Sequence, residues 1–182
     1  MHPKPTRAEV AAAAGKKVPD VIAPGLRVLF CGINPGLYSG ATGHHFARPG
    51  NRFWPALHHS GFTPHRIHPF DEHELIDYRL GITNFVERAT ARAGEVSHDE
   101  LRAGRRRLEA KVRRFKPRWL ALCGISAYRV VFAEKQAAVG PQERAIGDTR
   151  VWLLPNPSGL NAHYQLDALA REFARLRSAA TE

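Results

Sequence analysis

Two Asn-Pro steps follow apolar segments of the chain, and both could position an asparagine side chain for chemistry. Asn34 and Pro35 belong to the run GINPG, and Asn156 and Pro157 belong to the run LPNPSGLN. Proline fixes its own φ angle and restricts the preceding residue to extended conformations, so each asparagine would be held stiffly. An asparagine carbonyl can orient a water molecule by accepting its hydrogen bond. The alternative for Asn34 is a turn in which its side chain caps its own backbone.

The second Asn-Pro run also carries an apolar residue among small polar ones. Leu160 follows Ser158 and Gly159 and precedes Asn161. An exposed leucine at a loop tip is typical of a residue that inserts into a partner. Alternatively, Leu160 packs on the following helix as a hydrophobic staple. The sequence leaves both alternatives open.

A third segment, GHHFARPGNRFW, contains an aromatic residue that could bind a planar ligand. Phe46 lies outside any strand or helix pattern, so its ring could stack on a nucleic-acid base. Phe53 and Trp54 begin a helical pattern, and we expect them in the core. His44 and His45 are adjacent and would not point the same way on regular structure, so we expect no metal site.

Four short apolar runs predict the strands that must position these loops. They are Arg27–Ile33, Gly81–Asn84, Trp119–Cys123 and Val151–Leu154. The first, third and fourth are almost continuously apolar, as is typical of parallel strands covered on both faces. Helical patterns cover Arg52–His59, Asp71–Tyr78, His98–Phe115, Ser126–Glu134 and Gln165–Arg177.

We therefore predict one α/β domain with three layers, in which helices flank a short, mainly parallel, four-stranded sheet. Asn51 is the expected N-cap of the helix that begins near Arg52. Ligands of such sheets bind outside the carboxyl ends of the strands, where Asn34 and Asn156 would meet.

Length and composition fit a single folded domain with a basic character. The chain has 182 residues, of which 27 are Lys or Arg and 17 are Asp or Glu, for a formal net charge of +10. A small protein this basic is a candidate to bind a phosphate polymer. We expect residues 1–20 to form a flexible basic tail and residues 21–182 to form the folded domain. The two cysteines, Cys31 and Cys123, end apolar runs and are expected to be buried.

A membrane span needs about 18 consecutive apolar residues, and no apolar run approaches that length. No signal peptide is evident, so we expect a cytoplasmic protein without membrane contacts.

A basic stretch could either form a solvated helix face or attract phosphates without sequence preference. It comprises Arg102, Arg105, Arg106, Arg107, Lys111, Arg113, Arg114, Lys116 and Arg118.

Four motifs in order resemble the mismatch-specific uracil/thymine DNA glycosylase family of the uracil-DNA glycosylase superfamily. They are GINPG, GHHF with PGNRFW, TNFVERAT and LPNPSGLN, and the resemblance covers residues 21–178. It implies that Asn34 is the catalytic residue that orients the attacking water and that Phe46 stacks on the flipped pyrimidine. It further implies that Ile33, Ser39 and His45 help to bind the base. The wedge that enters DNA and contacts the orphaned guanine would comprise Ser158, Gly159, Leu160 and Asn161.

The implied activity is that of a monofunctional glycosylase that flips uracil, mispaired with guanine, out of double-stranded DNA and hydrolyses its N-glycosidic bond. Thymine and modified pyrimidines are further candidate bases. No lysine lies in the motif loops, so strand cleavage through a Schiff base is not expected. We expect a monomer without a cofactor. An acidic side chain, Asp77 or Glu87, could assist Asn34.

The sequence also departs from single branches of this family, and two other functions remain open. His44 and His45 resemble the thymine-excising branch, whereas Phe46 and NPSGL resemble the bacterial uracil branch. Ala162 stands where bacterial relatives carry an arginine after the wedge.

The chief alternative is a basic nucleic-acid-binding module of the same fold without excision. A nucleotide-binding protein that cradles phosphate in GINPG is disfavoured, because neither GxxxxGK[ST] nor GxGxxG occurs.

Overall fold

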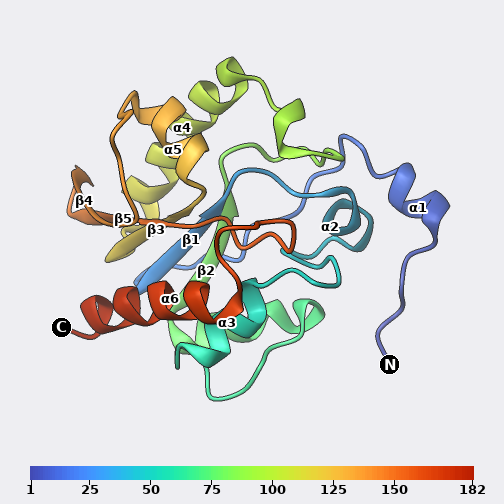
Figure 1. Cartoon of the computed structure of the whole chain (residues 1–182), viewed down its shortest axis with the longest axis horizontal. Coiled ribbons are helices and arrows are strands. Elements are labelled where there is room, and N and C mark those ends of the chain that lie inside the picture. Colours follow the sequence, from blue (N-terminus) through green and yellow to red (C-terminus); the bar gives the residue numbers. More distant parts are fainter.

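The computed structural model describes all residues from 1 to 182 and shows a five-stranded sheet between two layers of helices (Figure 1). The strand order is β2-β1-β3-β5-β4. Strands β1, β2, β3 and β5 run parallel, and β4 pairs antiparallel with β5. Their bounds are Val28–Gly32 (β1), Leu80–Asn84 (β2), Trp119–Cys123 (β3), Gly140–Ile146 (β4) and Thr149–Leu154 (β5).

The four predicted strands are all present, but the predicted count of four strands is wrong because β4 was missed. Strand β4 lies at the edge of the sheet and alternates between buried and exposed residues. It contains Pro141 and the charged pair Glu143 and Arg144, so it has no continuous apolar run. Its register shifts between Pro141 and Ala145. Such a half-exposed edge strand carries none of the signal that identifies a buried parallel strand.

Helices of unequal length cover the two faces of the sheet (Figure 1). Helices α3 and α6 pack on one face, and α4 and α5 pack on the other. Alternate residues of each strand enter separate cores: Phe30 packs with α3 and α6, and Cys31 packs with α4 and α5. The helical bounds are Arg7–Ala11 (α1), Leu37–Thr42 (α2), Phe53–His59 (α3), Pro69–Tyr78 (η1, a 3₁₀ helix), Ala93–Glu95 (η2, a 3₁₀ helix), His98–Phe115 (α4), Ile125–Phe132 (α5) and Leu166–Thr181 (α6).

Local sequence explains where the main helices begin. Ser97 Oγ caps α4 by accepting a hydrogen bond from Glu100 N–H, and the Glu100 carboxylate accepts a hydrogen bond from Ser97 N–H. At α3 the N-cap residue is Arg52, one position later than expected, although Asn51 Oδ1 still accepts a hydrogen bond from Phe53 N–H at 2.9 Å. Cys31 and Cys123 are buried, as the sequence predicts. No helix combines the length and apolar character that crossing a membrane requires.

The N-terminal segment, expected to be a flexible tail, makes contacts with the domain. Ala13 and Val18 are buried. The Asp20 carboxylate pairs with Lys111 of α4 and accepts a hydrogen bond from Thr83 of β2. The later half of this segment is therefore in contact with the domain, and the boundary at residue 20 stays a prediction. The mobility of the first residues stays a prediction.

Gly104 allows α4 to approach the sheet closely, and this contact predicts a loss of stability on substitution. A Cβ at Gly104 would lie 2.1 Å from the carbonyl oxygen of Phe85, which is backbone and cannot move freely. We expect Gly104→Ala to lower the free energy of unfolding by about 1–3 kcal/mol in urea titrations, despite the better helix propensity of alanine. Gly94→Ala is the matched control, because no atom lies within 4 Å of its Cβ position. Equal stability of the two variants would contradict this packing argument.

Candidate active site

The carboxyl ends of the four parallel strands surround a cleft of about 300 Å³. Asn34 enters it from the loop after β1, Asn84 from the end of β2, and Leu160 from the loop after β5. Phe46 forms another wall. The structure therefore brings together the two Asn-Pro loops and the aromatic loop, which are widely separated in the sequence. Of the predicted site residues, Ile33, Asn34, Ser39, His45, Phe46, Ser158 and Leu160 line this cleft.

The side-chain amide of Asn34 is held in one orientation. Its Nδ2 donates to the carbonyl oxygens of Arg88 (3.0 Å) and Pro35 (3.1 Å) and to Oγ1 of Thr90 (2.8 Å). Because two of these partners are carbonyl groups, which can only accept, the opposite amide orientation is excluded. Thr90 in turn donates to the carbonyl oxygen of Arg92 at 2.7 Å. The Asn34 Oδ1 has no partner within the chain and can accept a hydrogen bond from a water in the cleft.

Phe46 offers the cleft an aromatic face and a backbone donor. One face of its ring stacks on Phe53, with ring centroids 4.3 Å apart and planes inclined by 23°. Its φ angle is 50°, a left-handed conformation that non-glycine residues rarely adopt. Neither Phe46 N–H nor Ile33 N–H forms a hydrogen bond within the chain. Both residues line the cleft, so two backbone donors are available there to an acceptor on a ligand.

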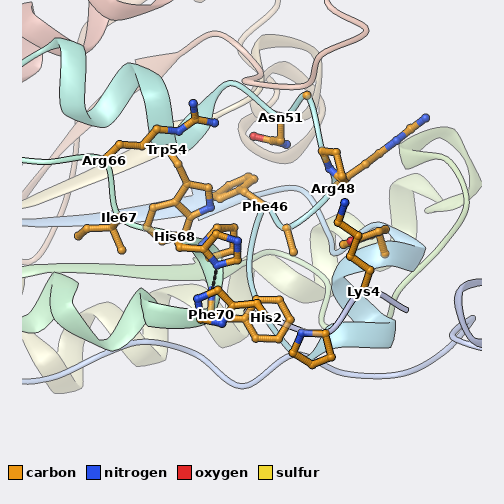
Figure 2. A pocket seen from close by; sticks show the side chains of 16 residues that line it. His2, Lys4, Phe46, Arg48, Asn51, Trp54, Arg66, Ile67, His68 and Phe70 are labelled. Carbon is orange, nitrogen blue, oxygen red and sulfur yellow. Dashed lines mark hydrogen bonds between the residues drawn. The ribbon is translucent and has the colours of Figure 1, made fainter. Parts of the chain in front are cut away.

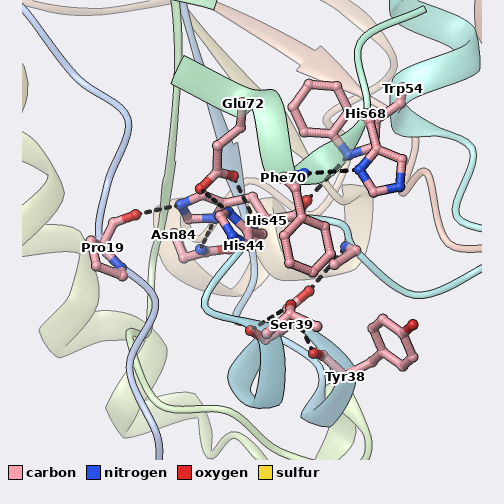
Figure 3. Close-up of polar contacts among 12 residues, drawn as sticks. Pro19, Tyr38, Ser39, His44, His45, Trp54, His68, Phe70, Glu72 and Asn84 are labelled. Atoms are coloured by element: carbon pink, nitrogen blue, oxygen red, sulfur yellow. Dashed lines mark hydrogen bonds and ion pairs between the residues drawn. The ribbon is translucent and has the colours of Figure 1, made fainter. Parts of the chain in front are cut away.

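Ser39 and His45 support the loop that carries Phe46 (Figure 3). Ser39 Oγ accepts a hydrogen bond from Ala47 N–H at 3.1 Å. His45 is buried, and its Nε2 lies 2.8 Å from the carbonyl oxygen of Pro19. Burial lowers the pKa of His45, and the bond to Pro19 opposes this change. A neutral ring that donates from Nε2 must accept at Nδ1.

Asn84 is a candidate site residue that our sequence analysis missed. Its Nδ2 lies 3.3 Å from Nδ1 of His45, and the neutral ring of His45 can only accept there. The Asn84 carbonyl oxygen therefore points the other way, and it lies 2.5 Å from the position that a Cβ on Gly32 would take. The sequence carried two signals for it, namely its position at the end of a predicted strand and its place in the motif TNFVERAT.

A buried carboxylate anchors the same loop from outside the cleft (Figure 3). Glu72 of η1 accepts a hydrogen bond from His45 N–H at 2.8 Å and lies 3.1 Å from Nδ1 of His44. Burial raises the pKa of Glu72 to about 7, although its bond to His45 N–H opposes the rise. Burial also lowers the pKa of His44. Both changes favour the neutral forms of the two side chains, which opposes an ion pair between Glu72 and His44.

Leu160 stands out from the domain on a loop with little apolar packing of its own. Its exposed fraction is 78%, and Met1 is the only large apolar residue that is more exposed. Packing of Leu160 on the following helix, α6, would have buried the side chain, so this exposure argues against that alternative. Two internal bonds shape the loop: Asn156 Oδ1 accepts from Ser158 N–H at 2.9 Å, and Asn161 Nδ2 donates to the Asn156 carbonyl at 3.0 Å.

A second cleft of about 400 Å³ adjoins the first and shares Phe46, Arg48 and Asn51 with it (Figure 2). Lys4 and Arg48 lie toward one end and Arg66 toward the other. None of these three cations forms an ion pair or a side-chain hydrogen bond, and no carboxylate lines the cleft.

The metal-ligating side chains closest together lie at the exposed edge of this second cleft. They are His2, His68 and Asp71, whose candidate ligand atoms lie within 4.8 Å of one another. All three are exposed, and none lines the cleft of Asn34. Exposed groups of this kind commonly occur without an ion, so they carry no metal assignment.

The structure separates several predicted residues from the cleft. Asp77 is exposed, Glu87 pairs with Lys17 at 3.2 Å, and neither lines the cleft. Arg105 of the basic stretch is engaged within the domain, since it pairs with Glu109 at 2.8 Å and lies over the ring of Phe132. Assistance to Asn34 from either acidic residue has no geometric support.

Comparison with known proteins identifies the superfamily and supports the fold. Residues 19–178 match the uracil DNA glycosylase superfamily. The chain is also similar to a solution NMR structure from Methanosarcina acetivorans, described as that of a candidate uracil DNA glycosylase, with a TM-score of 0.61 and 15% sequence identity. The similarity covers 92% of this chain and 99% of that chain. The predicted superfamily is confirmed, and the mismatch-specific branch stays a prediction.

The buried carboxyl of Glu72 predicts a pH-dependent stability. Because its pKa rises from 4.5 to about 7 on folding, the folded state holds the proton more tightly, and stability falls as the pH rises through this window. This difference between the pKa values of the unfolded and folded states corresponds to about 3 kcal/mol. We expect the free energy of unfolding of the wild type, relative to Glu72→Gln, to fall by about this amount between pH 4 and pH 8. Glu74→Gln, which alters an exposed carboxylate of the same helix, is the control. Parallel pH profiles of the wild type and Glu72→Gln would contradict the assignment.

Proposed function

Because the chain belongs to the uracil DNA glycosylase superfamily, we propose that it is a monofunctional, monomeric glycosylase that removes uracil mispaired with guanine from double-stranded DNA. Membership of the superfamily supports DNA glycosylase activity. The observation that carries the proposal is the fixed amide of Asn34, whose free oxygen shares a cleft with the ring of Phe46 and with unpaired backbone donors. We propose that no cofactor is needed, since the chain can supply both the donors to the base oxygens and the amide that orients the water.

The proposed reaction breaks the bond between the base and C1′ of deoxyribose. Electrons of this bond leave with the base, and the sugar gains oxocarbenium character. A water oxygen then bonds to C1′ and loses a proton, which the departing base anion takes up. The N–H groups of Ile33 and Phe46 would donate to the carbonyl oxygens of the base as its negative charge develops. Asn34 Oδ1 would orient the water. No carboxylate lines the cleft, so positioning and leaving-group stabilisation would dominate over strong general base catalysis.

The orientation of Asn84 would select among pyrimidines. Its free carbonyl oxygen can accept a hydrogen bond from the N3–H of uracil or thymine, whereas cytosine presents an acceptor at N3. Rotating the amide to suit cytosine would place the Asn84 oxygen against Nδ1 of His45, which has no hydrogen to donate. Uracil, thymine and pyrimidines with the same edge therefore fit the proposed pocket better than cytosine does.

A base inside a duplex is out of reach of the cleft, so the nucleotide must flip out at a cost of a few kcal/mol. A mispaired base is easier to unpair, which would favour G·U sites. Leu160 could fill the vacated place in the stack, as apolar wedges do in other DNA-bending proteins. The unpaired cations Lys4, Arg48 and Arg66 lie beside the cleft and would attract the DNA backbone.

Replacing the amide of Asn34 tests the proposed chemistry. We expect Asn34→Ala to slow single-turnover uracil release from a G·U duplex by about 100-fold or more, because the water loses its orienting group. Affinity for the same duplex, measured by fluorescence anisotropy, should change little. Undiminished release by Asn34→Ala would refute this role. Tight DNA binding by a wild type that releases no base from G·U, G·T or single-stranded substrates would instead favour a binding module.

Shortening the exposed leucine tests the proposed wedge. We expect Leu160→Ala to slow uracil release from a G·U duplex by about tenfold or more, because burial of a leucine side chain contributes about 1.5–3 kcal/mol. Release from a single-stranded oligonucleotide should be unchanged, since no base stack has to be filled. This second substrate is the internal control. An equal loss on both substrates would show that Leu160 acts on the base pocket rather than on the duplex.

A further inference from the structure

We propose that Arg52 is the positioning residue of the DNA wedge and that it sets the preference for double-stranded over single-stranded substrate. This inference rests on the proposed glycosylase function. It concerns a side chain that contacts neither the base pocket nor any reacting atom, and it follows from the way one guanidinium fixes the loop that presents Leu160.

The loop that presents Leu160, residues 157–165, is called the wedge loop. The guanidinium of Arg52 binds oxygen atoms along it. Its Nη1 donates to the carbonyl oxygens of Asn161 (2.7 Å), Tyr164 (2.9 Å) and Ser158 (3.3 Å). Its Nη2 donates to the carbonyl oxygen of Gly159 (3.0 Å) and to Oε1 of Gln165 (2.9 Å). The backbone N–H of Arg52 donates to the carbonyl oxygen of Pro157 at 2.8 Å. The acceptors thus lie on both sides of Leu160.

Close backbone contact reinforces this arrangement. A Cβ at Gly159 would lie only 2.6 Å from the carbonyl oxygen of Gly50, so the two loops touch at a position that requires glycine. Arg52 is also tied to the interior, since it directly precedes Phe53 and Trp54, which are buried in the core. The wedge loop is therefore shaped by a residue fixed to the core.

A stiff loop matters for a wedge but not for binding an unpaired base. An exposed leucine on a mobile loop would lose conformational freedom when it enters DNA, and that loss would weaken insertion. Arg52 removes this freedom beforehand. A single-stranded substrate needs no wedge, so only duplex substrates should depend on Arg52. Lysine cannot replace it, because a single ammonium group cannot reach acceptors spread around a planar guanidinium.

The test compares single-turnover uracil release from a G·U duplex and from a single-stranded oligonucleotide of the same sequence. We expect Arg52→Ala to slow duplex release by about tenfold, because several charge-assisted hydrogen bonds are lost, and to leave single-strand release within about twofold. Arg52→Lys should resemble Arg52→Ala. Arg52→Ala combined with Leu160→Ala should be no slower on the duplex than the slower single variant, as expected when one residue acts through the other. Arg129→Ala is the control and should match the wild type, because this exposed arginine of α5 binds only the carbonyl oxygen of Ala137 and lines neither cleft.

A second variant keeps the test decisive if Arg52→Ala folds poorly. Gly159→Ala would displace the loop from Gly50 without altering the guanidinium, and we expect the same duplex-selective loss. An equal loss on both substrates, no loss on either, or additive effects of Arg52→Ala and Leu160→Ala would overturn the inference. A wild type that releases uracil from neither substrate would instead refute the proposed function.

Discussion

The parallel pairing of β1 with both of its neighbours, and of β3 with β5, brings the loops that carry Asn34, Asn84 and Leu160 to one edge of the sheet. Gly32 is in register with Asn84 of β2, and Cys31 is in register with Leu122 of β3. The three strands therefore end at the same edge of the sheet, and their loops share one cleft. Glycine at position 32 is needed there, because a Cβ would collide with the side chain of Asn84. The site is thus a direct consequence of strand register, as is usual for parallel sheets.

Polar groups around the cleft have fixed orientations because their partners allow only one arrangement. Carbonyl oxygens orient the amide of Asn34, and the neutral ring of His45 orients the amide of Asn84. Glu72 holds the adjoining loop at the expense of stability, since burial opposes its ionisation. A destabilising buried carboxyl beside a binding cleft is characteristic of sites in which stability is exchanged for a defined geometry.

The sequence predicted those parts of the molecule that leave a local signal. Three of the four parallel strands are near-continuous apolar runs, and Asn34 and Leu160 stand next to proline or glycine in loops that follow such runs. Strand β4 was missed because an exposed edge strand has no apolar run. Asn84, Glu72 and Arg52 were missed as site residues for another reason: each acts through a partner far away in the chain, such as His45 or the carbonyl oxygens of residues 158–164. No local pattern records these long-range hydrogen bonds.

Net charge likewise fails to locate the surface that a phosphate polymer would meet. The densest basic stretch lies on α4, yet Arg102, Arg105 and Arg113 are paired with acidic residues of the same helix. Arg52 is saturated by neutral acceptors and serves the loop rather than a ligand. The cations without partners beside the cleft are Lys4, Arg48 and Arg66, which are scattered in sequence. A cation that already forms an ion pair or hydrogen bonds within the chain would have to break them to bind a phosphate. The unpaired cations, and not the total charge, therefore indicate where a DNA backbone would bind.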